Sequence, residues 1–293
     1  MSASAVIDVD RLNVSYGDFH AVKDLSFRVE RGELYALLGT NGAGKTSALE
    51  VIEGHRTASS GTVRVFGESP TDRRVVRPRM GIMLQESGFS PDLTVTESAR
   101  LIGRLTGRSD TVDRVLDLVD LTGKAGTRVA QLSGGEKRRL DFATAVYGEP
   151  ELVVLDEPTT GLDVQSRDAL WAAADRLREE GVTIVLTTHY LEEAQQRADR
   201  IGLMHQGTLR QEGTVVELTQ TLPSVISFAL PAGAPEPPID IARVNGAFHV
   251  ETFGLQEDLH RLLGWAHDTG VELQELRAGP TRLDDVFRAI SRD

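Results

Sequence analysis

Uninterrupted apolar runs, each bounded by polar or turn-forming residues, recur through the first two thirds of the chain. The clearest are Glu33–Leu38, Leu152–Leu155 and Thr183–Leu186. Short continuous runs of this kind are typical of strands that are buried on both faces, as in a parallel sheet covered by helices. The pattern therefore predicts an α/β fold with a parallel-sheet core.

A helical pattern separates the first of these runs from the second. Between Leu93 and Leu121, apolar residues recur at helical spacing and strand-like alternation is rare. The positions that carry the spacing are Val112, Val115, Leu116 and Val119. We interpret this region as a helical insertion in the sheet-forming domain, with expected limits of about 87–145.

The pattern changes near the C-terminus, where the proline-rich segment Pro231–Pro238 interrupts strands and helices. Three segments around it are strand-like, namely Val225–Leu230, Ala247–Phe253 and Val271–Leu276. Two amphipathic helices are also expected, one with Leu255, Leu259, Leu262, Leu263 and Ala266 on one face, and one with Leu283, Val286, Phe287 and Ile290. We therefore expect a small α+β C-terminal domain over residues 221–293, after a larger domain over residues 1–220.

Composition and charge exclude several classes of protein. The chain of 293 residues has 44 acidic and 32 basic side chains, and its net charge of −12, without a basic run, opposes nucleic-acid binding. Cysteine is absent, which excludes disulfides and thiolate metal sites. Met1–Asp8 lacks the features of a secretory signal, and the longest uncharged stretch near the C-terminus, Leu218–Pro235, is too polar to span a bilayer. We expect any role at a membrane to require another chain.

Gly39–Thr46 carries the first chemical signal. It matches the pattern G-x-x-x-x-G-K-[ST], follows a strand-like run and precedes a helix-compatible run, Ser47–Glu53. In such a loop, backbone N–H groups surround phosphate oxygens, Lys45 reaches the β- and γ-phosphates, and the Thr46 hydroxyl can bind Mg²⁺. The residues expected to contact the nucleotide here are Gly39, Thr40, Asn41, Gly42, Ala43, Gly44, Lys45, Thr46 and Ser47. The motif predicts a P-loop protein that binds ATP with Mg²⁺.

A second signal follows the apolar run Leu152–Leu155, which ends in Asp156 and Glu157. Parallel strands present ligands at their carboxyl ends. There, Asp156 can hold Mg²⁺ through water, while Glu157 can orient or deprotonate an attacking water. An apolar run ending in Asp-Glu is, taken alone, equally compatible with a strand that leads into a solvated turn. Together with the phosphate loop, it indicates ATP hydrolysis.

A third signal is Leu132–Glu136, whose Ser-Gly-Gly leads into a charged helical segment and is suited to bind an anion, or to serve only as a helix cap. The ordered set of motifs is Gly39–Thr46, Gln85, Leu132–Glu136, Leu155–Glu157, Gly161–Asp163 and His189. This set resembles the nucleotide-binding subunit of an ATP-binding-cassette (ABC) transporter over about residues 5–220. The resemblance implies a P-loop NTPase fold with a parallel-sheet core, an antiparallel β subdomain and the helical insertion.

The resemblance also implies a second nucleotide-binding domain, so that hydrolysis requires a dimer, most simply a homodimer. Two domains would pack head to tail, and Ser133, Gly134 and Gly135 of one would cap the γ-phosphate held by Lys45 of the other. Asp163 would lie at the interface between them.

Three further residues receive roles from the resemblance. Tyr16 would stack on adenine, Gln85 would contact Mg²⁺ or the attacking water and respond to the transport partner, and His189 would contact the γ-phosphate. Taken singly, these residues are equally compatible with a half-buried strand, a solvated loop and a hydrogen-bonded strand end. One departure is Glu136, where many members of the family have Gln; Glu should cap the helix start well.

The tail segment Leu283–Phe287 resembles the tail of the ATPase subunits of antibiotic and drug exporters of the daunorubicin-resistance type, although such a helix is equally compatible with core packing. We therefore expect an ATPase that energises export of a drug, antibiotic or lipid-like substrate through a separate integral-membrane permease. It would be peripheral, on the cytoplasmic side of the cell membrane. The alternatives are a soluble ABC ATPase that acts on ribosomes or DNA, and an importer ATPase with the same catalytic residues.

Overall fold

A computed structural model describes residues 5–85, 88–231, 233–239, 242–244 and 247–290. The chain forms two compact units, one up to Glu212 and the other from Gly213 onward. The sequence analysis placed the boundary after residue 220, which is after the first helix of the second unit, Val215–Thr219. The domain limits expected from the sequence remain predictions.

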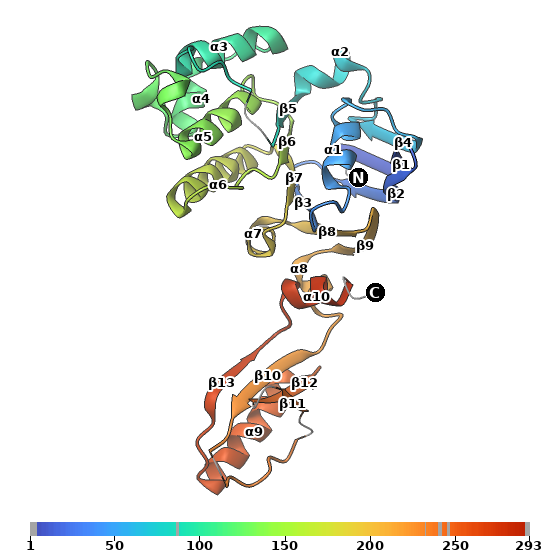
Figure 1. The fold of residues 1–293 in the computed structure, drawn as a ribbon, viewed down its shortest axis with the longest axis vertical. Coiled ribbons are helices and arrows are strands. Elements are labelled where there is room, and N and C mark those ends of the chain that lie inside the picture. The colour runs from blue at the N-terminus through green and yellow to red at the C-terminus, as the bar shows by residue number, and fades with distance from the viewer. Residues whose placement is uncertain (1–4, 86–87, 232, 240–241, 245–246, 291–293) are drawn as a thin grey trace. The chain divides into compact units, whose positions relative to one another are not determined.

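The first unit is built on a sheet that lies at the centre of its helices (Figure 1). Its strands are β3 (Leu34–Gly39), β5 (Met80–Met83), β6 (Leu152–Asp156), β7 (Thr183–Thr188), β8 (Arg200–His205) and β9 (Thr208–Gly213), in the order β5-β6-β7-β3-β8-β9. Strand β3 pairs in parallel with β7 and β8, and β6 pairs in parallel with β5 and β7. Every residue of β3, β6 and β7 is buried, which confirms the parallel-sheet core predicted from the apolar runs.

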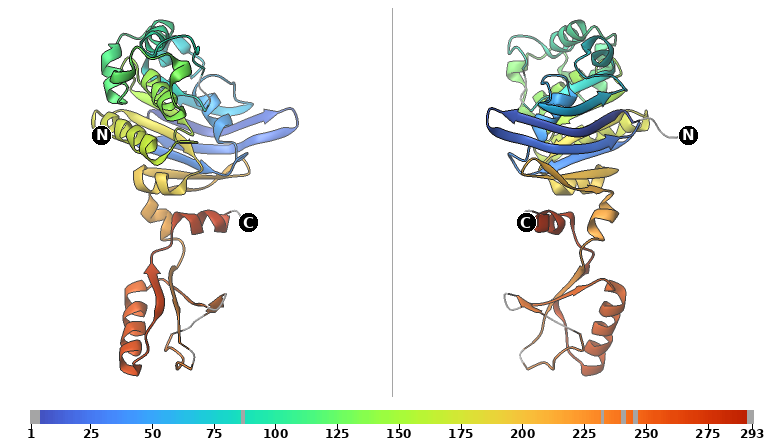
Figure 2. Two further views of the ribbon diagram at one scale, coloured as in Figure 1. Left: turned by 60° about the vertical axis from the view of Figure 1, so that its left-hand side comes forward. Right: turned by 90° about the vertical axis from the view of Figure 1, so that its right-hand side faces the viewer.

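A second, antiparallel sheet belongs to the same unit and corresponds to the expected antiparallel β subdomain. It consists of β1 (Ile7–Tyr16), β2 (Phe19–Val29) and β4 (Ser60–Val65), in the order β2-β1-β4. Figure 2 shows β1 and β2 as a long blue hairpin. Its apolar side chains share one hydrophobic core with Leu49 and Ile52 of α1 (Lys45–Ile52). This core fixes the helix that follows the phosphate loop.

Helices gather on the other side of the central sheet (Figure 1). They are α3 (Val95–Thr106), α4 (Val112–Leu118), α5 (Gly134–Ala145) and α6 (Val164–Glu179), while α2 (Arg73–Val76) precedes β5 and α7 (Leu191–Arg197) follows β7. Helix α3 begins with a capping box, in which Thr94 and Glu97 satisfy each other's backbone N–H groups. The helical pattern predicted over Leu93–Leu121 is therefore present as α3 and α4. The limits of the insertion, 87–145, remain a prediction, and residue 87 lies outside the described residues.

The second unit is a small α+β structure. It contains α8 (Val215–Thr219), β10 (Ser224–Ala229), β11 (Ala242–Val244), β12 (Ala247–Thr252), α9 (Leu255–Thr269), β13 (Gln274–Gly279) and α10 (Leu283–Ile290). The strands form an antiparallel sheet in the order β11-β12-β10-β13, and Leu262 of α9 packs against Ile226 and Phe248. Helix α10 packs against α8.

The last strand begins later than the sequence pattern predicted. We expected a strand over Val271–Leu276, whereas β13 begins at Gln274. The reason is the end of α9, where Gly270 has a φ of 67° and the N–H of Val271 donates to the carbonyl of Ala266. These residues complete the helix C-cap instead of joining the sheet. None of the described helices is long and apolar enough to cross a membrane.

Candidate functional site

The phosphate loop Gly39–Thr46 connects β3 to α1, so it lies at the carboxyl end of the central strand and at the N-terminus of a helix. Gly44 has a φ of 99°, and a Cβ atom there would lie 2.3 Å from the carbonyl oxygen of Ala21. Only glycine fits this position without displacing the backbone of β2. The loop therefore presents its N–H groups where an anion can approach both the loop and the helix dipole.

Lys45 is a buried cation, with 5% of its surface exposed. Its Nζ donates to the carbonyl oxygens of Gly39 at 2.9 Å and Thr40 at 3.3 Å, and lies 3.6 Å from Oε1 of Glu157. Burial lowers the pKa of Lys45, and the neighbouring carboxylate of Glu157 opposes this shift. A buried ammonium at the mouth of a Gly-rich loop is complementary to a phosphate group.

Asp156, the last residue of β6, is held by two hydroxyl groups. The Thr187 hydroxyl donates to its Oδ1, and the Thr46 hydroxyl lies 3.5 Å from the same oxygen. A carboxylate and a hydroxyl are hard oxygen donors, which Mg²⁺ prefers, and Mg²⁺ beside phosphates needs few ligands from the protein. Thr46 and Asp156 therefore fit a magnesium ion that is shared with a nucleotide.

Glu157 adopts an unusual backbone conformation, with a φ of 45° in the left-handed region. Its N–H bonds to both oxygens of Thr187, the carbonyl at 3.1 Å and the hydroxyl at 3.0 Å. Its Oε2 accepts from the Thr160 hydroxyl at 3.1 Å and lies 3.3 Å from Nδ1 of His189. The two adjacent carboxylates thus have separate surroundings, since Asp156 bonds to hydroxyls below the loop and Glu157 reaches Lys45 and His189.

These groups line one cavity of about 580 Å³. The predicted site residues that the structure brings together there are Tyr16, Asn41, Gly42, Ala43, Gly44, Lys45, Thr46, Ser47, Gln85, Glu157 and His189. Gly39 and Thr40 contact Lys45 through their carbonyls, and Asp156 lies behind Thr46. The cavity is also lined by Phe19, Ala21 and Thr160, which were not predicted from the sequence. Of these, Phe19 could have been found from the sequence, because it is a second aromatic residue just after Tyr16 and Gly17-Asp18; in the structure it pairs with Tyr16 in the β1–β2 hairpin and is 63% exposed.

Tyr16 is fixed in place by groups from α1 and from the loop after it. Its hydroxyl lies 3.1 Å from the Ser47 hydroxyl and donates to Oε2 of Glu50 at 3.2 Å. The guanidinium of Arg56 stacks 4.1 Å from the centre of the ring, and its Nε donates to the same carboxylate of Glu50 at 2.6 Å. The ring is therefore a pre-organised surface for a flat ligand.

Three predicted residues, Ser133, Gly134 and Gly135, are absent from the described lining of this cavity. They form the N-terminus of α5, where Ser133 and Gly134 are exposed. Glu136 accepts from the Ser133 N–H at 2.8 Å while its own N–H donates to the Ser133 hydroxyl at 3.1 Å, which confirms the capping role predicted for this Glu. The capping box occupies the N–H groups of Ser133 and Glu136, so the groups open to a ligand outside the chain's own cavity are the Ser133 hydroxyl and the N–H of the exposed Gly134.

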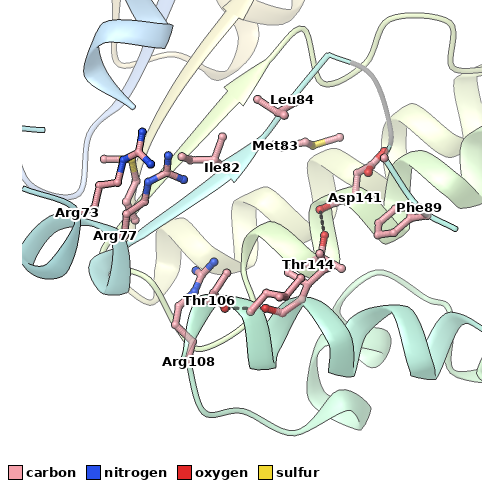
Figure 3. A pocket seen from close by; sticks show the side chains of 14 residues that line it. Arg73, Arg77, Ile82, Met83, Leu84, Phe89, Thr106, Arg108, Asp141 and Thr144 are labelled. Carbon is pink, nitrogen blue, oxygen red and sulfur yellow. Dashed lines mark hydrogen bonds between the residues drawn. The ribbon is translucent and has the colours of Figure 1, made fainter. Parts of the chain in front are cut away.

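A second cavity, of about 530 Å³, lies beside β5 and was not predicted from the sequence. Figure 3 shows the side chains that line it, including Arg73, Arg77, Arg108, Ile82, Met83, Leu84 and Phe89. Burial lowers the pKa of Arg77 and of Arg108, and the positive charges of neighbouring arginines lower both further. The cavity thus combines an apolar wall with a wall of three arginines, and the carboxylate of Asp141 also lines it.

Comparisons with known proteins agree with this geometry. Residues 22–160 match the ABC transporter family, and residues 224–281 match the C-terminal domain of proteins that contain an ABC transporter domain. The chain is 41% identical over 215 residues to a Nod factor export ATP-binding protein I of Paraburkholderia xenovorans (strain LB400), covering 71% of each chain. It is 40% identical over 217 residues to the protein of the same name from Bradyrhizobium diazoefficiens, covering 72% of this chain and 71% of that one.

Solved structures are similar as well. An ATP-binding subunit of an ABC transporter has a TM-score of 0.68 and 27% identity, over 74% of this chain and 92% of that chain. A bacterial ABC transporter cassette described as dimeric has a TM-score of 0.65 and 24% identity, over 71% of this chain and 98% of that one, and shares the fold.

Proposed function

Since this chain belongs to the ATP-binding proteins of ABC transporters, which bind and hydrolyse ATP, we propose that it powers export through a separate integral-membrane permease. The observation that carries the proposal is the cavity in which Lys45, Thr46, Glu157 and His189 meet at the phosphate loop. Export is supported by relatives at 40–41% identity that are named as export proteins.

In the proposed nucleotide complex, the N–H groups of the phosphate loop and the ammonium of Lys45 bind the β- and γ-phosphates, and Tyr16 stacks on adenine. Mg²⁺ would be held by Thr46, Asp156 and Gln85, and would neutralise the charge of the phosphates when bound. The Thr187 hydroxyl keeps the Asp156 carboxylate turned toward Thr46. The cofactors are thus ATP and Mg²⁺.

Hydrolysis then depends on Glu157. Its carboxylate lies in the cavity between Lys45 and His189, where it can accept a proton from the attacking water. His189 and Gln85 would contact the γ-phosphate and the water from either side. The strained backbone of Glu157 aims this carboxylate into the cavity, a common feature of catalytic positions.

A second copy of the chain would complete the site. Ser133, Gly134 and Gly135 stand at a helix N-terminus whose N–H groups suit a phosphate, yet they are not part of the described lining of the chain's own cavity. In a head-to-tail homodimer they would cap the γ-phosphate bound to the other chain. Cleavage of the γ-phosphate removes this contact, so the dimer can open again.

The second cavity supports contact with the permease. Leu84 lines this cavity and the next residue, Gln85, lines the nucleotide cavity, so one short segment connects both. Its cationic and apolar walls fit a partner segment with an acidic group and apolar side chains. The chain would then sit at the cytoplasmic side of the cell membrane, with a drug, antibiotic or lipid-like molecule as the exported substrate.

The Glu157→Gln variant tests the catalytic part of this proposal. It should bind ATP and remain as a closed dimer, observed by size-exclusion chromatography with ATP, because the site assembles without cleavage. Glu192→Gln, on the exposed part of α7, is the control and should behave as the wild type. Rapid ATP hydrolysis by Glu157→Gln would remove Glu157 from the catalytic role.

The partner is tested by purification from membranes. An export subunit should copurify with a small integral-membrane protein, and its ATPase activity should rise when a transported drug is added. Copurification with ribosomes or DNA would instead support a soluble ABC ATPase. Stimulation by a periplasmic or surface binding protein would support an importer.

A further inference from the structure

Arg138, on α5, makes an unusually complete set of hydrogen bonds. Its Nη1 donates to the carbonyls of Leu84 at 2.7 Å and Gln85 at 2.9 Å. Its Nη2 donates to the carbonyls of Asp156 at 2.9 Å and Glu157 at 2.8 Å, and its Nε to that of Pro158 at 2.9 Å. All five N–H donors of the guanidinium are therefore used, and all five acceptors are main-chain carbonyls.

The side chain is also deeply buried, with 6% of Arg138 exposed. Burial lowers its pKa, while the nearby carboxylates of Asp141, Asp156 and Glu157 oppose this shift. A buried guanidinium whose donors are all satisfied is rigid, and its planar fork fixes the directions of the groups that it binds. Lysine has three donors on one nitrogen and cannot bind the same five carbonyls.

The carbonyls belong to two segments that are distant in the sequence but meet at the nucleotide cavity. One contains Gln85 and the other contains Glu157. Glu157 has the left-handed φ of 45°, a conformation that is unfavourable for a residue with a side chain unless its surroundings hold it. Its N–H is held by Thr187, and its carbonyl is held by Arg138.

The position of Arg138 on α5 connects it to the start of that helix. The same helix begins with Ser133–Gly135, the residues that would meet the nucleotide of the second copy. Arg138 lies little more than one helical turn further on, so a displacement of the helix N-terminus reaches its side chain through a rigid element.

We propose that Arg138 is a positioning residue, which holds Gln85 and Glu157 in their catalytic arrangement and links that arrangement to the N-terminus of α5. This inference rests on the proposed roles of Gln85 and Glu157 in hydrolysis. It means that the carboxylate of one site is oriented by the same helix that contacts the nucleotide of the other site. Arg138 itself touches neither the nucleotide nor the water.

The test compares Arg138→Lys with Arg139→Lys. Arg139 is the neighbouring arginine of the same helix, and its Nη1 also donates to two main-chain carbonyls, of Val119 at 2.8 Å and Asp120 at 3.1 Å, away from the cavity. In Arg138→Lys, kcat should fall about ten- to hundredfold, as for a small misplacement of a catalytic group, while the Kd for ATP stays within about threefold. Arg139→Lys should keep the kcat of the wild type.

A double-mutant cycle with Glu157→Gln distinguishes positioning of Glu157 from a purely structural role of Arg138. Because Arg138 also holds Gln85, Arg138→Lys should still lower the residual rate of Glu157→Gln, but by clearly less than it lowers the wild-type rate, since the part of its effect that passes through Glu157 is already lost. Independent, multiplying effects would overturn the proposal. So would wild-type kcat in Arg138→Lys, or an equal loss in Arg139→Lys.

Hydrogen exchange provides a readout that needs no ATPase activity. In the protein without ATP, Arg138→Lys should speed exchange in the segments around Gln85 and Glu157, whereas Arg139→Lys should affect only the segment around Asp120. Unchanged exchange around Gln85 and Glu157 would refute the positioning role. Faster exchange together with a fully active Glu157→Gln variant would instead contradict the proposed catalytic role of Glu157 and leave the positioning intact.

Discussion

Replacing Thr187 by Val removes a hydroxyl that bonds to the Asp156 carboxylate and to the Glu157 N–H, while changing the side-chain volume little. Thr187 is fully buried, and its hydroxyl donates to Oδ1 of Asp156 and accepts the N–H of Glu157 at 3.0 Å. In the variant, the Glu157 N–H keeps the Thr187 carbonyl at 3.1 Å, so the main loss falls on the Asp156 carboxylate. A hydrogen bond to a charged group contributes about 1.5–3 kcal/mol, and the free energy of unfolding should fall by about this amount.

The same loss should weaken metal binding, because the Asp156 carboxylate is no longer fixed toward Thr46. Removing such an outer hydrogen bond commonly lowers metal affinity about ten- to hundredfold. The Mg²⁺ concentration for half-maximal ATPase activity should therefore rise at least about tenfold. Urea unfolding measures the stability, and a Mg²⁺ titration of the steady-state ATPase rate measures the second effect.

Thr188→Val is the matched control. Thr188 is buried on the same strand, and its hydroxyl accepts the N–H of Tyr190 at 2.9 Å, away from Asp156. Its loss should lower stability by about 1 kcal/mol without changing the Mg²⁺ requirement. An unchanged Mg²⁺ requirement in Thr187→Val, or an equal shift in Thr188→Val, would refute the reasoning.

Three further expectations follow from the geometry. Arg56→Gln uncovers one face of Tyr16, so the Kd for ATP should rise about two- to fivefold while the Kd for tripolyphosphate stays constant in calorimetry; equal weakening of both ligands would contradict this. Hydrogen bonds from Arg79 and Arg31 lower the pKa of Glu151 from 4.5 to about 2, so its stabilisation is present above pH 4.5 and is lost as the pH falls toward 2. Because the Glu151 side chain is 39% exposed, Glu151→Gln should lower the free energy of unfolding by about 1 kcal/mol or less at pH 6, and by clearly less at pH 3. Urea unfolding measures this difference, and a difference independent of pH would be inconsistent with the pairing. A Cβ atom at Gly135 would lie 2.1 Å from the Ser166 hydroxyl oxygen, so Gly135→Val should displace the start of α5. The variant should bind ATP as a monomer but no longer dimerise with ATP in light scattering. Intact dimers would argue against the capping role.

The sequence predicted those parts of the fold that depend on local patterns. The runs that became β3, β6 and β7 are apolar throughout because both faces of these strands are buried. Their carboxyl ends meet at one edge, which brings the phosphate loop, the carboxylates and His189 together as expected. Strand β1 has no clean alternation, because its pairing with β2 shifts register between Val9 and Leu12 and Arg11 has a φ of 46°. The antiparallel subdomain was therefore expected from the resemblance rather than from periodicity.

Roles that depend on contacts between distant segments left no pattern in the sequence. Arg138 bonds to main-chain carbonyls of two segments that are remote from it in the sequence, and an arginine on a charged helix is ordinarily solvated. Thr187 lies in a strand that is rich in β-branched residues, where a threonine is unremarkable. Only the folded chain shows which of these polar side chains are buried and what they bind.

Helix α1 has a consequence for how the protein handles its nucleotide. At its start, the side chain of Lys45 bonds to the phosphate loop. Further along the helix, Ser47 and Glu50 both bond to the hydroxyl of Tyr16. In the proposed complex, the distance between the base-binding ring of Tyr16 and the phosphate loop is thus set by one helix of 8 residues. The groups that would complete the site in the proposed dimer, Ser133–Gly135 of the other copy, belong to a different helix, α5. If the dimer opens as proposed, the contacts from α5 to the γ-phosphate are lost while those supported by α1 remain, which would separate the timing of ATP cleavage from that of nucleotide exchange.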